Sequence, residues 1–212
     1  MEIEKLYLTA ANLLHDSYVL AEKLVPFAPN FLVALWRGGT PVGMAVQEYL
    51  DYRGIHSDHI AIRTSAYAGI DVMHGEIRVH GLEYIADRLE PEHRLVIVDD
   101  VFDTGLTIQA VLKRIRHRCT TNMPPAANVR IATVYYKPSR NKTTLIPHDY
   151  VHETDKWLVF PHELTGLTFE EIVANKEPEI AAFFRKNSHA TPARKNTKKE
   201  SHLRAGSTTA TR

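Results

Sequence analysis

Three acidic residues lie within five positions of the sequence, at the end of a short apolar run. The segment Val96–Thr107 reads VIVDDVFDTGLT, in which Asp99 and Asp100 are adjacent and Asp103 follows three residues later. The apolar run is typical of a strand buried on both faces, and the small residues after Asp103 predict the turn that opens a helix. Backbone N–H groups at a helix N-terminus, together with the two threonine hydroxyls, form a binding site for an anion such as phosphate.

The adjacent acids require a second ligand, because they would repel a bare phosphate. Carboxylates beside a phosphate site are suited to sugar hydroxyls and to a divalent cation. Acids near a helix N-terminus also stabilise the helix by about 0.3–1 kcal/mol each, without any function. Three acids in five residues exceed what a helix N-terminus needs, so we predict a ligand site in which Gly105 permits close approach of the backbone.

A second loop of small and charged residues follows another apolar run. The run Phe31–Trp36 reads FLVALW, and the residues after it are Arg37, Gly38, Gly39 and Thr40. Glycine amides turned toward an anion, with the fixed charge of arginine beside them, would bind phosphate oxygens. On its own, however, an Arg-Gly-Gly sequence is more typical of a plain turn between a strand and a helix.

Apolar runs alternate with helical periodicities along the chain and predict the elements that position these loops. We predict strands over residues 31–36, 59–65, 76–80, 95–99, 129–136, 150–152 and 157–160. We predict helices over residues 10–24, 41–49, 107–118, 168–174 and 178–186, the first of them capped by Thr9. Strand–turn–helix units in this order indicate an α/β fold with a mostly parallel sheet, in which ligands bind at the carboxyl ends of the strands.

The composition is that of an ordinary globular protein and excludes several classes. Apolar residues make up 44% and charged residues 24% of the 212 positions, enough for one domain with a sizeable core or two small ones. No apolar run approaches the ~20 residues of a membrane span, and the N-terminus lacks the pattern of a signal peptide. The single cysteine, Cys119, cannot form an internal disulfide, so we expect a reducing, cytoplasmic location and no membrane partner.

The charge is unevenly distributed, with a basic stretch at the C-terminal end. Residues 187–212 carry six Lys or Arg and one acid, a net charge of +5, whereas the whole chain carries +1 and the first 186 residues therefore −4. This stretch cannot bury enough apolar surface to offset its ordering entropy. We predict one domain over residues 1–186, with its core at about 30–165. The remaining 187–212 form a disordered tail, which we expect to be a solvated extension that does not bind nucleic acid.

The segment VIVDDVFDTGLT resembles the signature with which type I phosphoribosyltransferases bind 5-phosphoribosyl-1-pyrophosphate (PRPP). Counting Leu95 just before it, four apolar residues, two acids and two apolar residues are followed by Asp-Thr-Gly, a leucine and a closing Thr. The resemblance covers about residues 30–165. It implies the type I phosphoribosyltransferase-like fold, with a mostly parallel central sheet flanked by helices and a small hood for the acceptor base.

The resemblance also implies roles for both loops. The paired acids would hold the ribose hydroxyls and help to position Mg²⁺, with Asp100 as the first candidate metal contact and Asp99 as the second. In this family the Arg-Gly-Gly loop binds pyrophosphate and can hold a cis peptide bond that does not precede proline. The PRPP-binding residues would be Arg37, Gly38, Gly39, Asp99, Asp100, Asp103, Thr104, Gly105, Leu106 and Thr107.

Residues after the last long predicted strand resemble those that select the base in the 6-oxopurine members of the family. Lys137 would donate a hydrogen bond to the purine O6 and would reject adenine, whose 6-amino group is itself a donor. A solvated loop lysine is the alternative. The segment WLVFPHE resembles the one that closes the base pocket of xanthine–guanine phosphoribosyltransferases. This resemblance implies that Trp157 stacks on the purine and that the backbone of Leu158 forms hydrogen bonds with the purine edge. It also implies that Glu163 contacts the substituent near C2. Glutamate stands here where the family has aspartate.

The segment 66–75 fits the flexible loop that closes over the reacting sugar in this family. It opens with Ser65-Ala66-Tyr67, which is similar to the family's opening residues but lacks a lysine found there. Closure of such a loop excludes water from the reacting atoms.

Together these features predict an enzyme that transfers the phosphoribosyl group from PRPP to hypoxanthine, guanine or xanthine. The resemblance implies Asp103 as general base, Mg²⁺ as cofactor and a homo-oligomer, either a dimer or a tetramer. Two alternatives stay open. One is a non-catalytic PRPP-sensing regulator on the same fold, and the other is a phosphoribosyltransferase for adenine, orotate or uracil.

Overall fold

The computed structural model describes residues 4–66 and 77–187, which fall into two compact units, 1–165 and 166–212. Residues 67–75 of the predicted flexible loop and 188–212 of the predicted tail lie outside the described residues. The predicted core over about 30–165 lies within the first unit. The extension of that domain to residue 186 stays a prediction.

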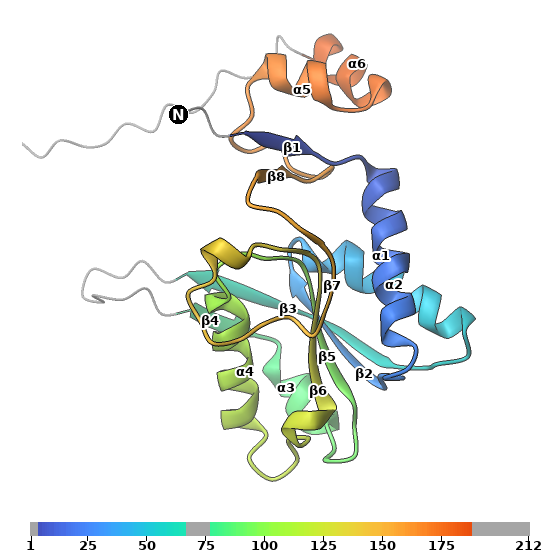
Figure 1. Ribbon diagram of the computed structural model, residues 1–212, viewed down its shortest axis with the longest axis vertical. Coiled ribbons are helices and arrows are strands. Elements are labelled where there is room, and N and C mark those ends of the chain that lie inside the picture. The colour runs from blue at the N-terminus through green and yellow to red at the C-terminus, as the bar shows by residue number, and fades with distance from the viewer. Residues whose placement is uncertain (1–3, 67–76, 188–212) are drawn as a thin grey trace, which may run out of the picture. The chain divides into compact units, whose positions relative to one another are not determined.

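A mostly parallel sheet of six strands forms the centre of the first unit, in the order β4-β3-β2-β5-β6-β7 (Figure 1). The strands are Phe31–Trp36 (β2), Asp58–Ala66 (β3), Ile77–His80 (β4), Leu95–Phe102 (β5), Val129–Tyr136 (β6) and Asp149–Glu153 (β7). Only the β3–β4 pair is antiparallel. This arrangement confirms the predicted α/β fold with a mostly parallel sheet.

Helices cover both faces of this sheet, which explains why its central strands are apolar at consecutive positions. Leu32 of β2 packs in one core cluster with α1 (Ala10–Leu24) and α2 (Gly39–Tyr52). Its neighbours Phe31 and Val33 point to the opposite face and pack with α3 (Leu82–Arg88) and α4 (Leu106–Arg118). Alternate residues of one strand therefore serve two cores, and Figure 1 shows the two helix pairs on opposite sides of the sheet.

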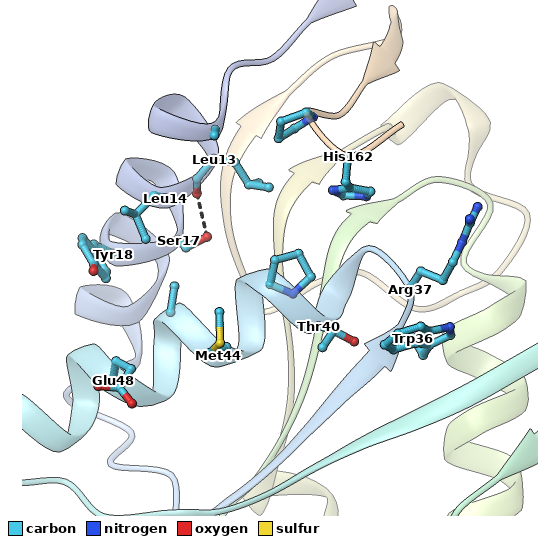
Figure 2. Close-up of a pocket in the computed structure, with 14 residues that line it drawn as sticks. Leu13, Leu14, Ser17, Tyr18, Trp36, Arg37, Thr40, Met44, Glu48 and His162 are labelled. Carbon is cyan, nitrogen blue, oxygen red and sulfur yellow. Dashed lines mark hydrogen bonds between the residues drawn. The ribbon is translucent and has the colours of Figure 1, made fainter. Parts of the chain in front are cut away.

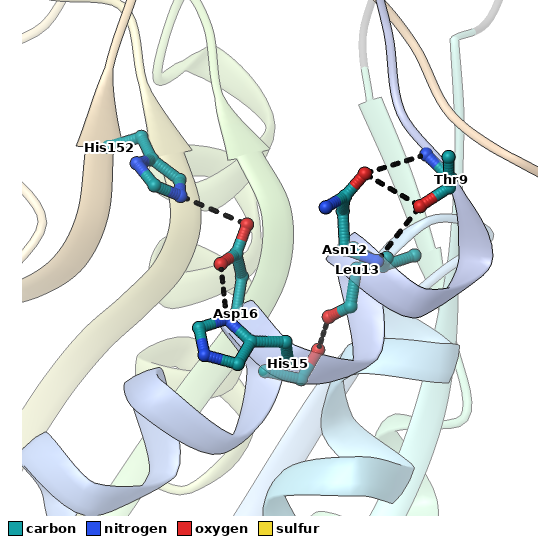
Figure 3. A network of polar contacts seen from close by, with 7 residues as sticks. Thr9, Asn12, Leu13, His15, Asp16 and His152 are labelled. Carbon is teal, nitrogen blue, oxygen red and sulfur yellow. Dashed lines mark hydrogen bonds and ion pairs between the residues drawn. The ribbon is translucent and has the colours of Figure 1, made fainter.

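Polar contacts join α1 to the edge strand β7 (Figure 3). Thr9 caps α1 through a capping box, as predicted. Further along the helix, the buried Asp16 has its Oδ2 2.9 Å from Nε2 of His152 in β7 and its Oδ1 3.1 Å from Nδ1 of His15. A buried carboxylate needs such partners, and here they fix the helix against the sheet.

A second, two-stranded parallel sheet pairs β1 (Lys5–Tyr7) with β8 (Trp157–Val159). The N-terminal segment thereby holds the chain that carries Trp157 and Leu158. Sequence patterns did not predict β1, because three residues show no periodicity and their partner lies about 150 positions away.

Several further elements differ from the predictions. The sequence patterns missed α3 and two short 3₁₀ helices, η1 (Ala126–Asn128) and η2 (Pro138–Arg140). Helix α2 begins at Gly39, two residues before the predicted start, so the Arg-Gly-Gly turn runs directly into the helix. Strand β5 continues past the predicted end to Phe102, because it pairs with β6 as far as Tyr136.

The second unit contains the two late helices that the sequence predicts. Helix α5 (Phe169–Asn175) begins with a capping box between Thr168 and Glu171, and α6 (Pro178–Lys186) begins with proline in its first turn. In the part of the chain that the structure describes, no helix combines the length and apolar character needed to cross a bilayer.

Candidate functional site

The two predicted loops meet at the carboxyl ends of β2 and β5, which are adjacent parallel strands. Their approach leaves no room for side chains at the two glycines. A Cβ atom placed on Gly38 would lie 1.7 Å from Oδ2 of Asp100, and one on Gly39 would lie 2.6 Å from the carbonyl oxygen of Val98. The peptide bond between Trp36 and Arg37 is cis, as the family resemblance leads one to expect. At Gly39 the obstructing atoms include backbone, so close contact between the loops requires glycine at this position.

The paired acids are the fifth and sixth of the eight residues of β5, and they lie partly buried against Gly38 and Gly39. The backbone N–H of Asp100 donates to Oδ1 of Asp99 at 3.0 Å, and that of Val101 donates to Oδ1 of Asp100 at 2.8 Å. Burial, followed by the charge of Asp100, raises the pKa of Asp99 well above its ordinary value. Burial also raises the pKa of Asp100. Two adjacent carboxyl groups with raised pKa values are suited to a ligand that supplies hydroxyl donors or positive charge.

The raised pKa of Asp99 predicts that this residue destabilises the ligand-free protein. A carboxyl whose pKa is raised by folding binds more protons in the folded state, so stability falls as pH rises toward the raised pKa and the full cost is present above it. We expect Asp99→Asn to raise the melting temperature at about pH 8 and to change it little at about pH 4. Thermal unfolding at both pH values measures this effect, and an equal change at both would contradict the assignment.

The turn after β5 has the shape expected of an anion site. Gly105 has φ +76°, the left-handed conformation that glycine adopts readily, and it precedes the first residue of α4. Helices α4 and α2 both begin without a side-chain cap hydrogen bond and without an acid in their first turn. Asp103, Thr104 and Thr107 line a small hollow of about 70 Å³ at the start of α4. The predicted phosphate-binding residues are thus brought together around the backbone amides at the start of α4, where the N–H of Leu106 donates to Oγ1 of Thr104 at 3.4 Å.

The chain after β6 braces this turn. The backbone N–H of Lys137 donates to the carbonyl of Phe102 at 2.9 Å, and that of Lys142 donates to the carbonyl of Thr104 at 3.0 Å. Nε of Arg140 donates to Oδ1 of Asp103 at 2.5 Å. The sequence patterns did not identify Arg140, because its partner is 37 residues away and its segment shows no periodicity.

Lys137 is buried at the end of β6, with 5% of its surface exposed, so it is not the solvated lysine that the sequence left as an alternative. Burial lowers the pKa of its ammonium group, and the nearby carboxylates of Asp103, Asp155 and Glu163 partly offset this by raising it. A lysine that is desolvated but surrounded by acids can donate directly to a ligand atom.

The segment 157–163 contributes further candidate residues to the site, in addition to the loops that follow β2 and β5. Trp157 is half exposed at the start of β8, and Leu158 is buried in the core. Glu163 accepts a hydrogen bond from the backbone N–H of Phe160 at 3.1 Å. Its charge raises the pKa of both Asp100 and Lys137, so Glu163 lies near the acid pair of β5 and near the end of β6. The base-binding roles of these residues stay predictions.

A large hollow of about 940 Å³ lies beside the glycine loop, between α1 and α2 (Figure 2). Trp36 and Arg37 line one end of it together with His162, whose ring stacks on Phe160. The charge of His162 lowers the pKa of Asp100. Sequence patterns predict neither a role for His162 nor this hollow, because both depend on segments that are far apart in the chain.

With this geometry in view, the class of protein is defined by comparison with known families. Residues 17–166 match the model of the phosphoribosyl transferase domain. The match covers more than half of the chain, so the chain belongs to the phosphoribosyl transferase family. Membership of the family that its PRPP signature predicts is confirmed.

Two solved structures and one curated protein are similar to this chain. A purine phosphoribosyltransferase from Pyrococcus horikoshii Ot3 is 29% identical, with a TM-score of 0.58, over 77% of this chain and 97% of that chain. The xanthine-guanine-hypoxanthine phosphoribosyltransferase of Helicobacter pylori is 18% identical, with a TM-score of 0.55, over 74% of this chain and 91% of that chain, a likeness of fold alone.

The adenine phosphoribosyltransferase of Carboxydothermus hydrogenoformans is 33% identical over 97 residues, which are 45% of this chain. The match spans 55%, about half, of the length of that curated relative.

Proposed function

We propose that this protein transfers the 5-phosphoribosyl group from PRPP to a 6-oxopurine, releasing pyrophosphate and forming a purine nucleoside monophosphate for purine salvage. The observation that carries the proposal is the packing of the Asp99–Asp100 pair against Gly38 and Gly39, beside the uncapped start of α4. One site thereby offers carboxylates for a ribose. It also offers backbone amides for two phosphate groups, one set from the glycine loop and one from the start of α4.

Each part of PRPP has a counterpart in this site. The turn from Asp103 to Thr107 receives the 5′-phosphate, and the loop from Arg37 to Gly39 receives the pyrophosphate. The acids Asp99 and Asp100 accept hydrogen bonds from the ribose hydroxyls. These contacts hold C1′ of the ribose in front of the space where the base binds.

The acid pair also fits a magnesium ion. Within the described residues, no group of three or more His, Cys, Asp or Glu side chains could hold a metal ion. Asp100, with Asp99 as a second contact, suits a Mg²⁺ that takes its other ligands from PRPP oxygens and water. When bound, such an ion supplies positive charge to the pyrophosphate leaving group.

The reaction exchanges one bond at C1′ for another. The bond from C1′ to the pyrophosphate oxygen breaks through an oxocarbenium-like transition state, and the bond from the purine N9 to C1′ forms. Asp103 accepts the proton that the imidazole ring of the purine loses. The Asp99–Asp100 pair keeps the ribose oriented while positive charge develops at C1′ and the pyrophosphate departs.

Lys137 supports a 6-oxopurine as acceptor, because a buried ammonium group donates to an oxygen at C6 and not to the amino group of adenine. We expect Lys137→Met to lower kcat/KM for hypoxanthine about 100-fold. Lys142→Met, which removes an exposed lysine from the same segment, is the matched control and should leave the rate unchanged. Initial rates with hypoxanthine measure both, and equal rates for the two variants would remove Lys137 from this role.

Adenine is the second candidate acceptor, because the curated relative that matches this chain is an adenine phosphoribosyltransferase. A PRPP-dependent assay with hypoxanthine, guanine, xanthine and adenine separates the candidates. Nucleotide formation from one or more of the first three supports the proposal. Turnover of adenine alone would overturn the 6-oxopurine assignment, and PRPP binding without any turnover would favour a non-catalytic regulator.

We further propose that the enzyme is a homo-oligomer, a dimer or tetramer, assembled through the hollow between α1 and α2. Leu14 and Met44 are large apolar side chains exposed on its walls. A two-fold axis would place the exposed apolar side chains of one copy against those of the other.

Met44→Glu tests this interface, because a charge at its centre opposes association. We expect the wild type to elute as a dimer or larger species and Met44→Glu as a folded monomer in size-exclusion chromatography with light scattering. Tyr52→Glu is the matched control, since Tyr52 is exposed on the same helix but does not line the hollow. A monomeric wild type, or the same size for both variants, would contradict the proposal.

A cytoplasmic location stays a prediction.

A further inference from the structure

Arg140 and Asp103 face one another from neighbouring turns. Strands β5 and β6 pair in parallel as far as Phe102 and Tyr136, so the turns that follow them start side by side. Nε of Arg140 donates to Oδ1 of Asp103 at 2.5 Å. Within the described residues, no donor contacts the second oxygen, Oδ2. One oxygen of the carboxylate is therefore held and the other is left for a ligand.

The backbone that carries Arg140 is itself fixed. Its own N–H donates to the carbonyl of Lys137 at 3.2 Å, which closes the short helix η2. The next side chain, Asn141, donates to the carbonyl of Leu145 at 2.7 Å, and the N–H of Lys142 donates to the carbonyl of Thr104 at 3.0 Å. The guanidinium group thus extends from a braced segment, which limits the positions it can give to the carboxylate.

Lys137 supplies the reason why such a restraint is needed. The backbone N–H of Lys137 donates to the carbonyl of Phe102 at 2.9 Å, so the lysine starts beside Asp103, and η2 joins it to Arg140. Burial lowers the pKa of Lys137 most, the charge of Asp103 raises it, and that of Arg140 lowers it. A carboxylate without Arg140 would turn toward the ammonium group of Lys137. Pairing of those two would occupy both the proton acceptor and the donor that the purine needs.

We propose that Arg140 is a positioning residue for the general base, an inference that rests on the proposed function. It holds Oδ1 of Asp103, keeps the carboxylate apart from Lys137, and presents Oδ2 to the imidazole N–H of the incoming purine. As the bond from N9 to C1′ forms, the proton moves from the purine to Oδ2. Arg140 itself does not contact the reacting atoms.

Arg140→Ala tests this role in the full-length enzyme. We expect kcat for transfer to the preferred purine to fall by about 10- to 100-fold, as for other small displacements of a reacting group. The dissociation constant of PRPP, measured by titration calorimetry, should stay within about threefold, because the phosphate contacts are untouched. Added guanidinium ion at millimolar concentration should restore part of kcat in this variant and not in the wild type. Arg140→Lys should recover less than the wild-type rate, since a lysine cannot reproduce the planar fork.

Lys142→Ala is the matched control, because it removes an exposed cation two residues away and keeps the backbone N–H that braces the turn. The Arg140–Asp103 pair is half exposed, and exposed pairs contribute little to stability, so the variants should fold. An unchanged kcat in Arg140→Ala would overturn the inference. So would a lowered kcat that guanidinium does not restore, or failure of both Arg140→Ala and Arg140→Gln to fold, since either marks a structural role. Absence of transfer by the wild type would instead refute the proposed function on which the inference rests.

Discussion

Asp103→Asn should lower kcat by about 10²- to 10⁴-fold while leaving PRPP affinity nearly unchanged. The amide keeps the shape of the carboxylate and can still accept the hydrogen bond from Arg140, so the turn that binds the 5′-phosphate should retain its structure. It cannot accept the proton that the purine loses. Steady-state rates with the preferred purine measure kcat, and titration calorimetry with PRPP and Mg²⁺ measures the affinity.

Asp87→Asn is the control for this substitution, because Asp87 is an exposed acid in α3 on the surface of the same unit. It should match the wild type in both measurements. Turnover of Asp103→Asn at the wild-type rate would remove Asp103 from the role of general base. A large loss of PRPP affinity would assign Asp103 to substrate binding instead.

Gly39→Ala should disrupt the pyrophosphate loop. The added methyl group would lie 2.6 Å from the carbonyl oxygen of Val98 and 2.9 Å from Cα of Asp99, and both are backbone atoms that cannot rotate away. Helix α2 and its loop must therefore shift away from β5, with an expected stability loss of about 1–3 kcal/mol. We expect kcat/KM for PRPP to fall at least about 100-fold, because a displacement of about 1 Å has effects of that size.

Gly54→Ala separates the loss of activity from the loss of stability. Gly54 has a positive φ of +75°, and no atom lies within 4 Å of the place where its Cβ would stand. Alanine there should cost about 1–2 kcal/mol through the left-handed conformation alone. Thermal unfolding should show comparable losses for the two variants, and only Gly39→Ala should lose activity. If Gly39→Ala kept its activity, the pyrophosphate loop would have been wrongly assigned.

The parts of the fold that could be predicted are those with a local physical signal. The bounds of β2 and β6 agree with their apolar runs, because strands covered on both faces need apolar residues at every position. Helix α3 has a usable signal that was overlooked, since Leu82, Ile85 and Leu89 recur at helical spacing after Gly81. Strand β1 has none, because only its pairing with β8 defines it.

The residues of the candidate site also divide into those with a local sequence signal and those without one. The acids of β5 and the Arg-Gly-Gly loop could be found because each forms a compact motif in the sequence. The pairing of Arg140 with Asp103 and the burial of Lys137 could not, since they arise where turns from neighbouring strands meet. Sequence motifs therefore predict the candidate ligand-binding groups, and the structure adds the side chains that pack around them.

The most direct test of the central claim is the reaction of the wild-type protein with PRPP, Mg²⁺ and a 6-oxopurine, followed by separation and quantification of the products. We expect a purine nucleoside monophosphate from hypoxanthine, guanine or xanthine, with one pyrophosphate released for each nucleotide formed and almost no nucleotide with Asp103→Asn. Pyrophosphate release without nucleotide, or no product from any of the three bases, would contradict it.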